Sequence, residues 1–211
     1  MACLAMLFAT AEQVQAGVIS ADHATFGVGS LTRDTVQDLD FLDLTESRSR
    51  SFNDVSSQFG VGGDFEGFRY ATEGEVIRLI NNYGFTPGAV AGERVFGSGP
   101  GGELSGLVEL LGVTIPYTGG GGITFGTTST LVDYHTPVFR IIGLGTQVDS
   151  NVSPHPFPVV DARQMRVPTS TSVQIGSFLV RSSPTVVPEP ASLAIWSLGL
   201  VGMTFARRRR S

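Results

Sequence analysis

Four aspartates near the start of the chain have the type and spacing of cation ligands. Asp34, Asp38, Asp40 and Asp43 lie close together, and hard cations such as Ca²⁺ take several carboxylate oxygens. No EF-hand loop or nonapeptide calcium repeat surrounds them, and leucines alternate with them, which is also typical of a solvated strand face. We expect no bound metal and keep Asp38, Asp40 and Asp43 as the candidates if one is present.

Carboxylates later in the chain are candidates for acid and base chemistry. Glu109, Asp133 and Asp161 are scattered through the second half. Two facing carboxylates can hydrolyse a glycosidic bond, but spacing along the chain does not reveal such a pair. A carboxylate-dependent hydrolase is therefore the alternative to our leading expectation, which is a protein that is not an enzyme.

Composition excludes several other chemistries. All 14 basic residues are arginines, so lysine Schiff bases and a P-loop lysine are absent. The one cysteine is Cys3, and the three histidines are far apart in sequence. The G-x-G-x-x-G pattern at 97–102 has no acidic residue about 20 positions later, as a dinucleotide site requires. We therefore expect no cofactor. A formal net charge of −5 also disfavours binding to phosphate backbones, so we expect no nucleic acid partner.

The elements that position these residues follow from apolar spacing. Helices are predicted over 52–59, 73–83 and 103–111, and the second has a capping box, Thr72 with Glu75, and a terminal Gly84. A strand-like segment precedes them at 39–44. Residues rich in Thr, Val and Ile predict strands near 123–126, 130–134, 138–142 and 173–181. We therefore expect an α+β fold in a single domain, with helices in the N-terminal half and antiparallel strands in the C-terminal half.

The N-terminal segment has features of an export signal. Residues 2–11 are apolar, and small residues precede a candidate cleavage site between Ala16 and Gly17. No basic residue precedes the apolar run, so a start codon further upstream and a buried N-terminal helix are both open. We interpret 1–16 as a signal peptide and 17–187 as the extracytoplasmic domain.

The C-terminal segment combines three features in a fixed order. Pro188, Glu189 and Pro190 hold the chain extended, because proline fixes its own φ and disfavours helix in the residue before it. The uncharged run 191–206 follows and predicts a transmembrane helix. Four arginines then end the run, which predicts a cytoplasmic C-terminus and a domain outside the inner membrane: Arg207, Arg208, Arg209 and Arg210.

Together these residues resemble the PEP-CTERM sorting signal of Gram-negative bacteria, over 188–211. The resemblance implies recognition by an exosortase, processing near Pro188–Pro190, and delivery to the cell surface or extracellular matrix. A second resemblance links 34–181 to C-type-lectin-like modules of such proteins, through the segments 39–45, 51–59, 67–76 and 175–181. In this segment we expect Arg69 to pair with a nearby acid, Glu73 or Glu75 or the aspartates of 38–43.

The leading hypothesis is an exported, non-catalytic surface or matrix protein. It is sorted through an exosortase and the inner membrane, and its domain binds an exopolysaccharide, a surface glycan, another matrix polymer or another surface protein. Two alternatives stay open, an exported hydrolase and a purely structural matrix component.

Overall fold

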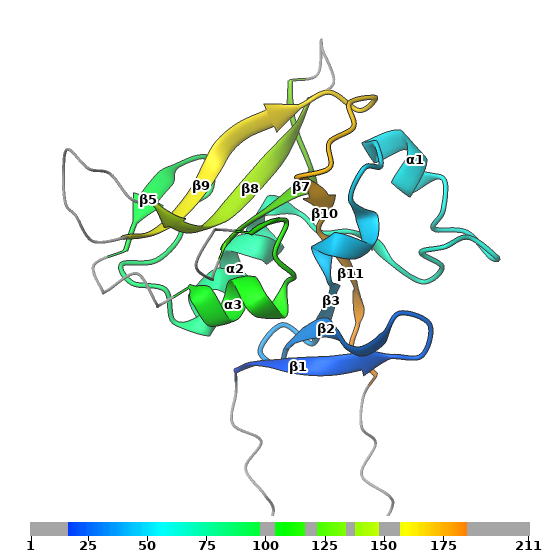
Figure 1. Cartoon of the computed structure of the whole chain (residues 1–211), viewed down its shortest axis with the longest axis horizontal. Helices are drawn as coiled ribbons and strands as arrows, with labels where there is room; N and C mark the ends of the chain where they lie inside the picture. The colour runs from blue at the N-terminus through cyan, green and yellow to red at the C-terminus, as the bar shows by residue number, and fades with distance from the viewer. Residues whose placement is uncertain (1–16, 98–103, 117–121, 134–137, 148–156, 185–211) are drawn as a thin grey trace, which may run out of the picture.

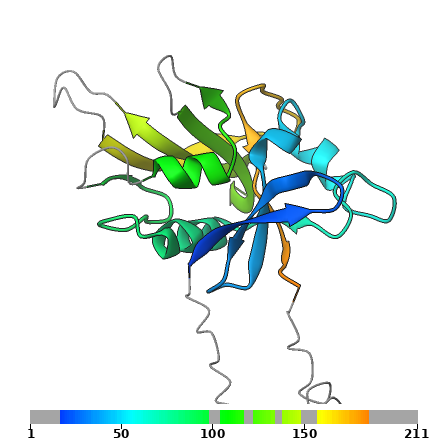
Figure 2. The same ribbon diagram turned by 60° about the horizontal axis from the view of Figure 1, so that its bottom comes forward.

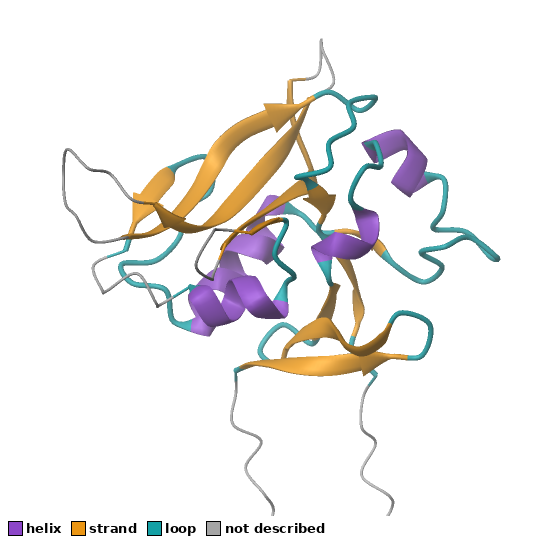
Figure 3. Cartoon of the chain, viewed as in Figure 1, coloured by secondary structure: helices purple, strands orange, loops and turns teal. Residues whose placement is uncertain are grey.

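The computed structural model describes residues 17–97, 104–116, 122–133, 138–147 and 157–184 (Figure 1). These residues form two β-sheets, with the helices packed mainly in the space between them (Figure 3).

Sheet A lies at the end of the molecule where the described chain begins and finishes (Figures 1 and 2). Its strand order is β1-β2-β3-β11-β4, and all its neighbouring strands are antiparallel. The strands are β1 (Val18–His23), β2 (Gly27–Asp34), β3 (Leu39–Leu42), β4 (Arg69–Tyr70) and β11 (Leu179–Ser182).

Sheet B lies on the far side of the molecule from the two chain ends (Figures 1 and 2). Its order is β10-β7-β8-β9-β5, and β6 also pairs with β7. All neighbours are antiparallel except β10 and β7. The strands are β5 (Arg94–Phe96), β6 (Ile115–Pro116), β7 (Gly122–Asp133), β8 (Val138–Gln147), β9 (Phe157–Arg166) and β10 (Gly176–Ser177).

The helices are short except for one. They are the 3₁₀ helix η1 (Leu44–Ser47), α1 (Phe52–Ser56), α2 (Glu73–Tyr83) and α3 (Ser105–Leu110). The predicted boundaries of α2 are confirmed, because its capping box joins Thr72 and Glu75 and Gly84 ends it in the left-handed conformation. The Arg69–Glu75 pair is also present, with Nη2 and Oε1 2.7 Å apart.

Two hydrophobic clusters are built on sheet A, one on each face. The larger cluster joins Phe41 and Val180 of sheet A to α2, α3 and the inner face of sheet B. The smaller cluster joins Leu42 and Leu179, on the opposite face, to α1 and to Phe65. Neighbouring residues of one strand therefore enter different clusters, since successive side chains of a strand point to opposite faces.

The predicted α+β division of the chain is wrong. The N-terminal half supplies β1 to β5, and the fold is predominantly β-sheet with few helices. The helices expected over 52–59 and 103–111 are reduced to five and six residues. β1, β2 and β9 were not predicted, because their polar and glycine residues lack the regular apolar alternation of a strand with one face in the core.

The predicted transmembrane helix is not among the helices that the structure describes. Within the described ranges, no helix is both long enough and apolar enough to cross a bilayer. Residues 191–206, where we expected it, lie outside those ranges.

The close packing at Gly126 predicts that replacing it with alanine affects stability differently from the same replacement at Gly74. A Cβ at Gly126 would lie 2.5 Å from side-chain atoms of both Leu44 and Phe178, whereas a Cβ at Gly74, in α2, would meet nothing within 4 Å. Gly126→Ala should lower the free energy of unfolding by about 1–3 kcal/mol through overpacking. Gly74→Ala, the matched control, should leave it unchanged or raise it by up to about 1 kcal/mol, because alanine favours helix. Urea denaturation measures both, and equal effects would contradict the packing at Gly126.

The capping box of α2 predicts a pH-dependent contribution to stability. The hydrogen bonds from Arg69 outweigh burial and, with those from Thr72, lower the pKa of Glu75 from 4.5 to about 2. Because the folded-state pKa is the lower one, ionised Glu75 stabilises the fold above about pH 4.5, and this is lost as the pH falls towards 2.

Glu75→Gln should therefore cost about 1 kcal/mol at neutral pH, and less as the solution is acidified. Urea denaturation of wild type and variant at a series of pH values measures the difference. The exposed Glu93→Gln is the control and should change little at any pH. A Glu75→Gln cost that is independent of pH would contradict the assignment.

Candidate functional site

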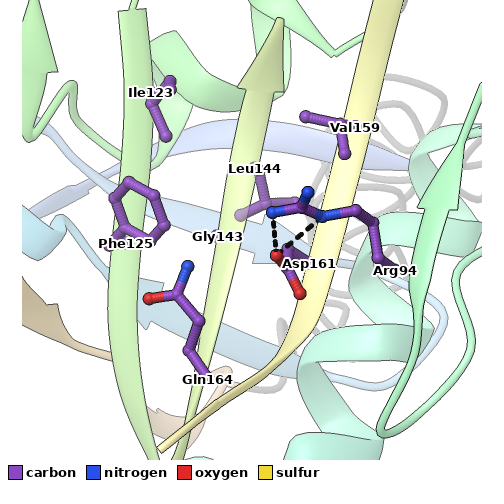
Figure 4. Close-up of a pocket in the computed structure, with 8 residues that line it drawn as sticks. All are labelled: Arg94, Ile123, Phe125, Gly143, Leu144, Val159, Asp161 and Gln164. Atoms are coloured by element: carbon purple, nitrogen blue, oxygen red, sulfur yellow. Dashed lines mark hydrogen bonds and ion pairs between the residues drawn. The ribbon is translucent and has the colours of Figure 1, made fainter. Parts of the chain in front are cut away.

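A shallow pocket opens on the outer face of sheet B, the face turned away from α2 and α3 (Figure 4). We call it the outer-face pocket. Its volume is about 110 Å³, and it is lined by Arg94, Ile123, Phe125, Gly143, Leu144, Val159, Asp161 and Gln164.

Strand register explains why these residues meet. One row across β7, β8, β9 and β5 is Phe125, Gly143, Asp161 and Arg94, and the next row is Ile123, Gly145, Val159 and Phe96. Directly opposed residues of antiparallel strands share a face. Both β8 positions are glycines, so the middle of this face has no side chains and the residues of β7 and β9 stand on either side.

Phe125 depends on one of these glycines. A Cβ at Gly143 would fall within 2.6 Å of two atoms of the Phe125 ring. The ring therefore lies across the position that a side chain at 143 would occupy, and Figure 4 shows it facing the open middle of the sheet. This gives the pocket an aromatic wall on the β7 side.

Asp161 forms the charged wall on the β9 side. Its Oδ2 accepts hydrogen bonds from Arg94, one from Nε at 2.8 Å and one from Nη2. Arg163 donates to Oδ1 from Nε at 3.1 Å and from its backbone N at 3.1 Å. Burial would raise the pKa of Asp161, but these hydrogen bonds and the charge of Arg94 outweigh it and hold the pKa below its usual value.

Gln164 and Arg94 carry the polar groups that are free to bind. Among the described residues, nothing hydrogen-bonds to the Gln164 amide or to Nη1 of Arg94. Figure 4 shows the amide pointing into the pocket, towards Phe125. The pocket thus combines apolar surface with both donors and an acceptor that have no internal partner.

The candidate metal ligands lie in different surroundings: Asp38, Asp40 and Asp43. Asp43 caps η1 and accepts from Thr45 N at 2.8 Å. Asp38 is exposed in the β2–β3 turn, with φ at 53°. Over the described part of the chain, no group of three or more His, Cys, Asp or Glu side chains is arranged to hold a metal ion.

Asp40 is fully buried and paired with cations. Arg33 Nε lies 2.6 Å from Oδ1 and Arg181 Nη2 lies 3.5 Å from Oδ2, while Ser183 Oγ donates to Oδ1 at 2.7 Å. Burial acts to raise the pKa of Asp40, but the hydrogen bonds from Arg33 and Ser183 and the two positive charges lower it overall. The carboxylate is therefore a structural ion-pair partner of the arginines.

Of the hydrolase candidates, the two whose side chains are described, Asp161 and Glu109, are not brought together. Asp161 lies on the outer face of sheet B, whereas Glu109 is on α3, which packs against the inner face through Leu107 and Val108. The side chain of Asp133 lies outside the described part of the structure.

Several predicted residues also fall outside the described ranges. These are Ala16, Pro188, Glu189, Pro190 and Arg207 to Arg210, while Gly17 is described and hydrogen-bonds to Thr35.

Sequence reasoning missed most of the pocket. Of its lining residues only Asp161 was singled out, and for hydrolysis. A signal was available in the alternation of Ile123 and Phe125 with small polar residues, and in two glycines two positions apart at 143 and 145. Neither signal indicates which strands pair.

Comparison with known proteins identifies the C-terminal segment. Residues 186–210 match the model of the PEP-CTERM protein-sorting motif. No curated protein and no solved structure matches the chain, so the resemblance to C-type-lectin-like modules has no support. The motif implies an exported protein that exosortase processes at the membrane. The chain therefore carries a PEP-CTERM sorting motif at residues 186–210, which supports an exosortase-targeted protein.

Proposed function

We propose that the folded domain is a non-catalytic binding module of the cell surface or extracellular matrix, and that it binds a polysaccharide or surface glycan in the outer-face pocket. The sorting motif supports such a location, because it implies export and exosortase processing. The observation that carries the proposal is the free Gln164 amide beside the Phe125 ring in one open pocket.

The chemistry of the pocket suits a sugar ring. A pyranose presents an apolar face of C–H groups and an edge of hydroxyls that donate and accept. Phe125 and Ile123 offer apolar surface for the face. The Gln164 amide can both donate and accept, and Arg94 Nη1 can donate to a second hydroxyl. Asp161 keeps Arg94 in place, since two of the guanidinium nitrogens bind its carboxylate.

The size of the pocket favours a polymer over an enclosed small molecule. Pockets that enclose a small ligand usually measure about 300–1,000 Å³, whereas this one measures about 110 Å³. A site of this size holds one unit of a chain that continues across the protein surface. The exposed side chain of Phe96, opposite Val159, extends the apolar surface beyond the pocket.

The state of Asp161 supports binding without catalysis. A general acid must hold a proton near neutral pH, whereas Arg163 and Arg94 lower the pKa of Asp161. Its carboxylate oxygens already accept hydrogen bonds from both arginines. Glu109, on the other side of sheet B, is not placed to act with it.

Replacing Gln164 should weaken binding to the polymer without changing the fold. Gln164→Ala removes one amide that can make two hydrogen bonds to a sugar, so the dissociation constant should rise about tenfold. Gln174→Ala is the matched control, because Gln174 is also exposed but lies in the loop before β10. Binding of the secreted protein to a glycan array and to insoluble extracellular polysaccharides measures both variants.

The alternatives predict different results in the same assay. Equal binding by the two variants would contradict the site, and no binding to any polymer would favour a purely structural matrix component. Release of new reducing ends from a bound polysaccharide would instead favour the hydrolase. We expect no release, from wild type or from Asp161→Asn.

A further inference from the structure

Gly17, which precedes β1, is hydrogen-bonded to the turn between β2 and β3. The backbone N of Gly17 donates to Thr35 Oγ1 at 2.7 Å, and the backbone N of Thr35 donates to Gly17 O at 3.0 Å. These contacts fix the start of β1 at the closed end of the β2–β3 hairpin.

Ser183, which follows the last strand β11, is hydrogen-bonded to the same hairpin. The backbone N of Ser183 donates to Asp38 O at 2.9 Å, and its hydroxyl donates to the buried carboxylate of Asp40 at 2.7 Å. Asp40 is itself held by Arg33 of β2 and Arg181 of β11. We call the set Gly17, Thr35, Asp38, Asp40 and Ser183 the terminal clamp.

The clamp brings both ends of the domain to one end of sheet A. Strand register places Val18, Asp34, Leu39 and Ser182 in a single row across four neighbouring strands. Three strand spacings separate the outer members, on the order of 15 Å. The start of β1 and the end of β11 accordingly lie on the same side in both views (Figures 1 and 2).

The distance from the clamp to the sorting motif is short. The motif begins at residue 186, and its Pro188 is five positions after the clamped Ser183. Five residues span at most about 18 Å even when fully extended. A domain of this length has a radius of gyration of about 15 Å, so it is wider than the tether is long. An enzyme that acts at Pro188 must therefore work beside the folded domain.

We propose that exosortase processes this chain in contact with the end of sheet A formed by the Thr35–Asp38 turn, and that the clamp sets this short reach. The outer-face pocket then points away from the enzyme, because sheet B lies on the opposite side of the molecule (Figure 2). The inference concerns maturation, so it does not depend on the ligand of the pocket.

Tether length is the first test. Deleting Pro184 and Thr185 leaves residues 186–210 intact and shortens the reach from Ser183 to Pro188 to about 11 Å at most. The full-length chain is expressed in a host with exosortase, and intact mass measures the processed fraction over time. The deletion should slow processing several-fold, since the domain then blocks the approach of the enzyme.

Replacing the same two residues with Gly-Ser is the matched control. It keeps the length and changes the sequence, so processing should proceed at the wild-type rate. Thermal unfolding of the unprocessed chains verifies that both variants keep the fold. A deletion variant processed at the wild-type rate, or a replacement as slow as the deletion, would overturn the proposal.

Crosslinking is the second test. Val36 is 56% exposed in the β2–β3 turn, and Val61 is 96% exposed in the loop after α1, at another side of the molecule. A photoreactive residue at Val36 should capture exosortase, identified by mass, in the unprocessed full chain. The same residue at Val61 should capture much less. Equal or greater capture at Val61 would show that another face meets the enzyme.

Discussion

The central strands of sheet A, β3 and β11, pack against apolar residues on both faces, and the rest of the domain depends on this burial. One face carries Phe41 and Val180 into the larger cluster with α2, α3 and sheet B, and the other carries Leu42 and Leu179 into the smaller cluster under α1. These two strands thus lie between the two clusters. Removing both faces from water is the main source of stability for such strands.

A charged residue within these strands must be paired. Asp40 points to the face of the smaller cluster, and it is fully buried there between Arg33 and Arg181. A buried carboxylate without such partners would carry a large desolvation cost. The same carboxylate accepts from Ser183 and so fastens the end of the last strand. The buried Asp40 therefore also fixes the position of Ser183, at the end of the domain.

Sheet B is covered on one face only, and this makes a site possible. Its inner residues Ile142 and Val160 enter the larger cluster, while the outer row of Phe125, Gly143 and Asp161 meets solvent at the pocket. The two sheets divide the molecule into an end where the described chain begins and finishes and a far side that carries the outer-face pocket (Figure 1).

Local signals in the sequence determined α2 and the sorting motif, and they limited the partner of Arg69 to a few nearby acids, among which the structure selects Glu75. The helix depends on a local capping and apolar pattern, and the sorting motif on a fixed order of short segments, and such patterns are readable without the fold. β1, β2 and β9 carry no such pattern. Whether Asp40 lies beside Asp43 or Arg33, and whether Asp161 faces Glu109 or Arg94, depends on strand register. Only the tertiary structure decides register, because it pairs residues far apart in sequence through hydrogen bonds that every backbone can make.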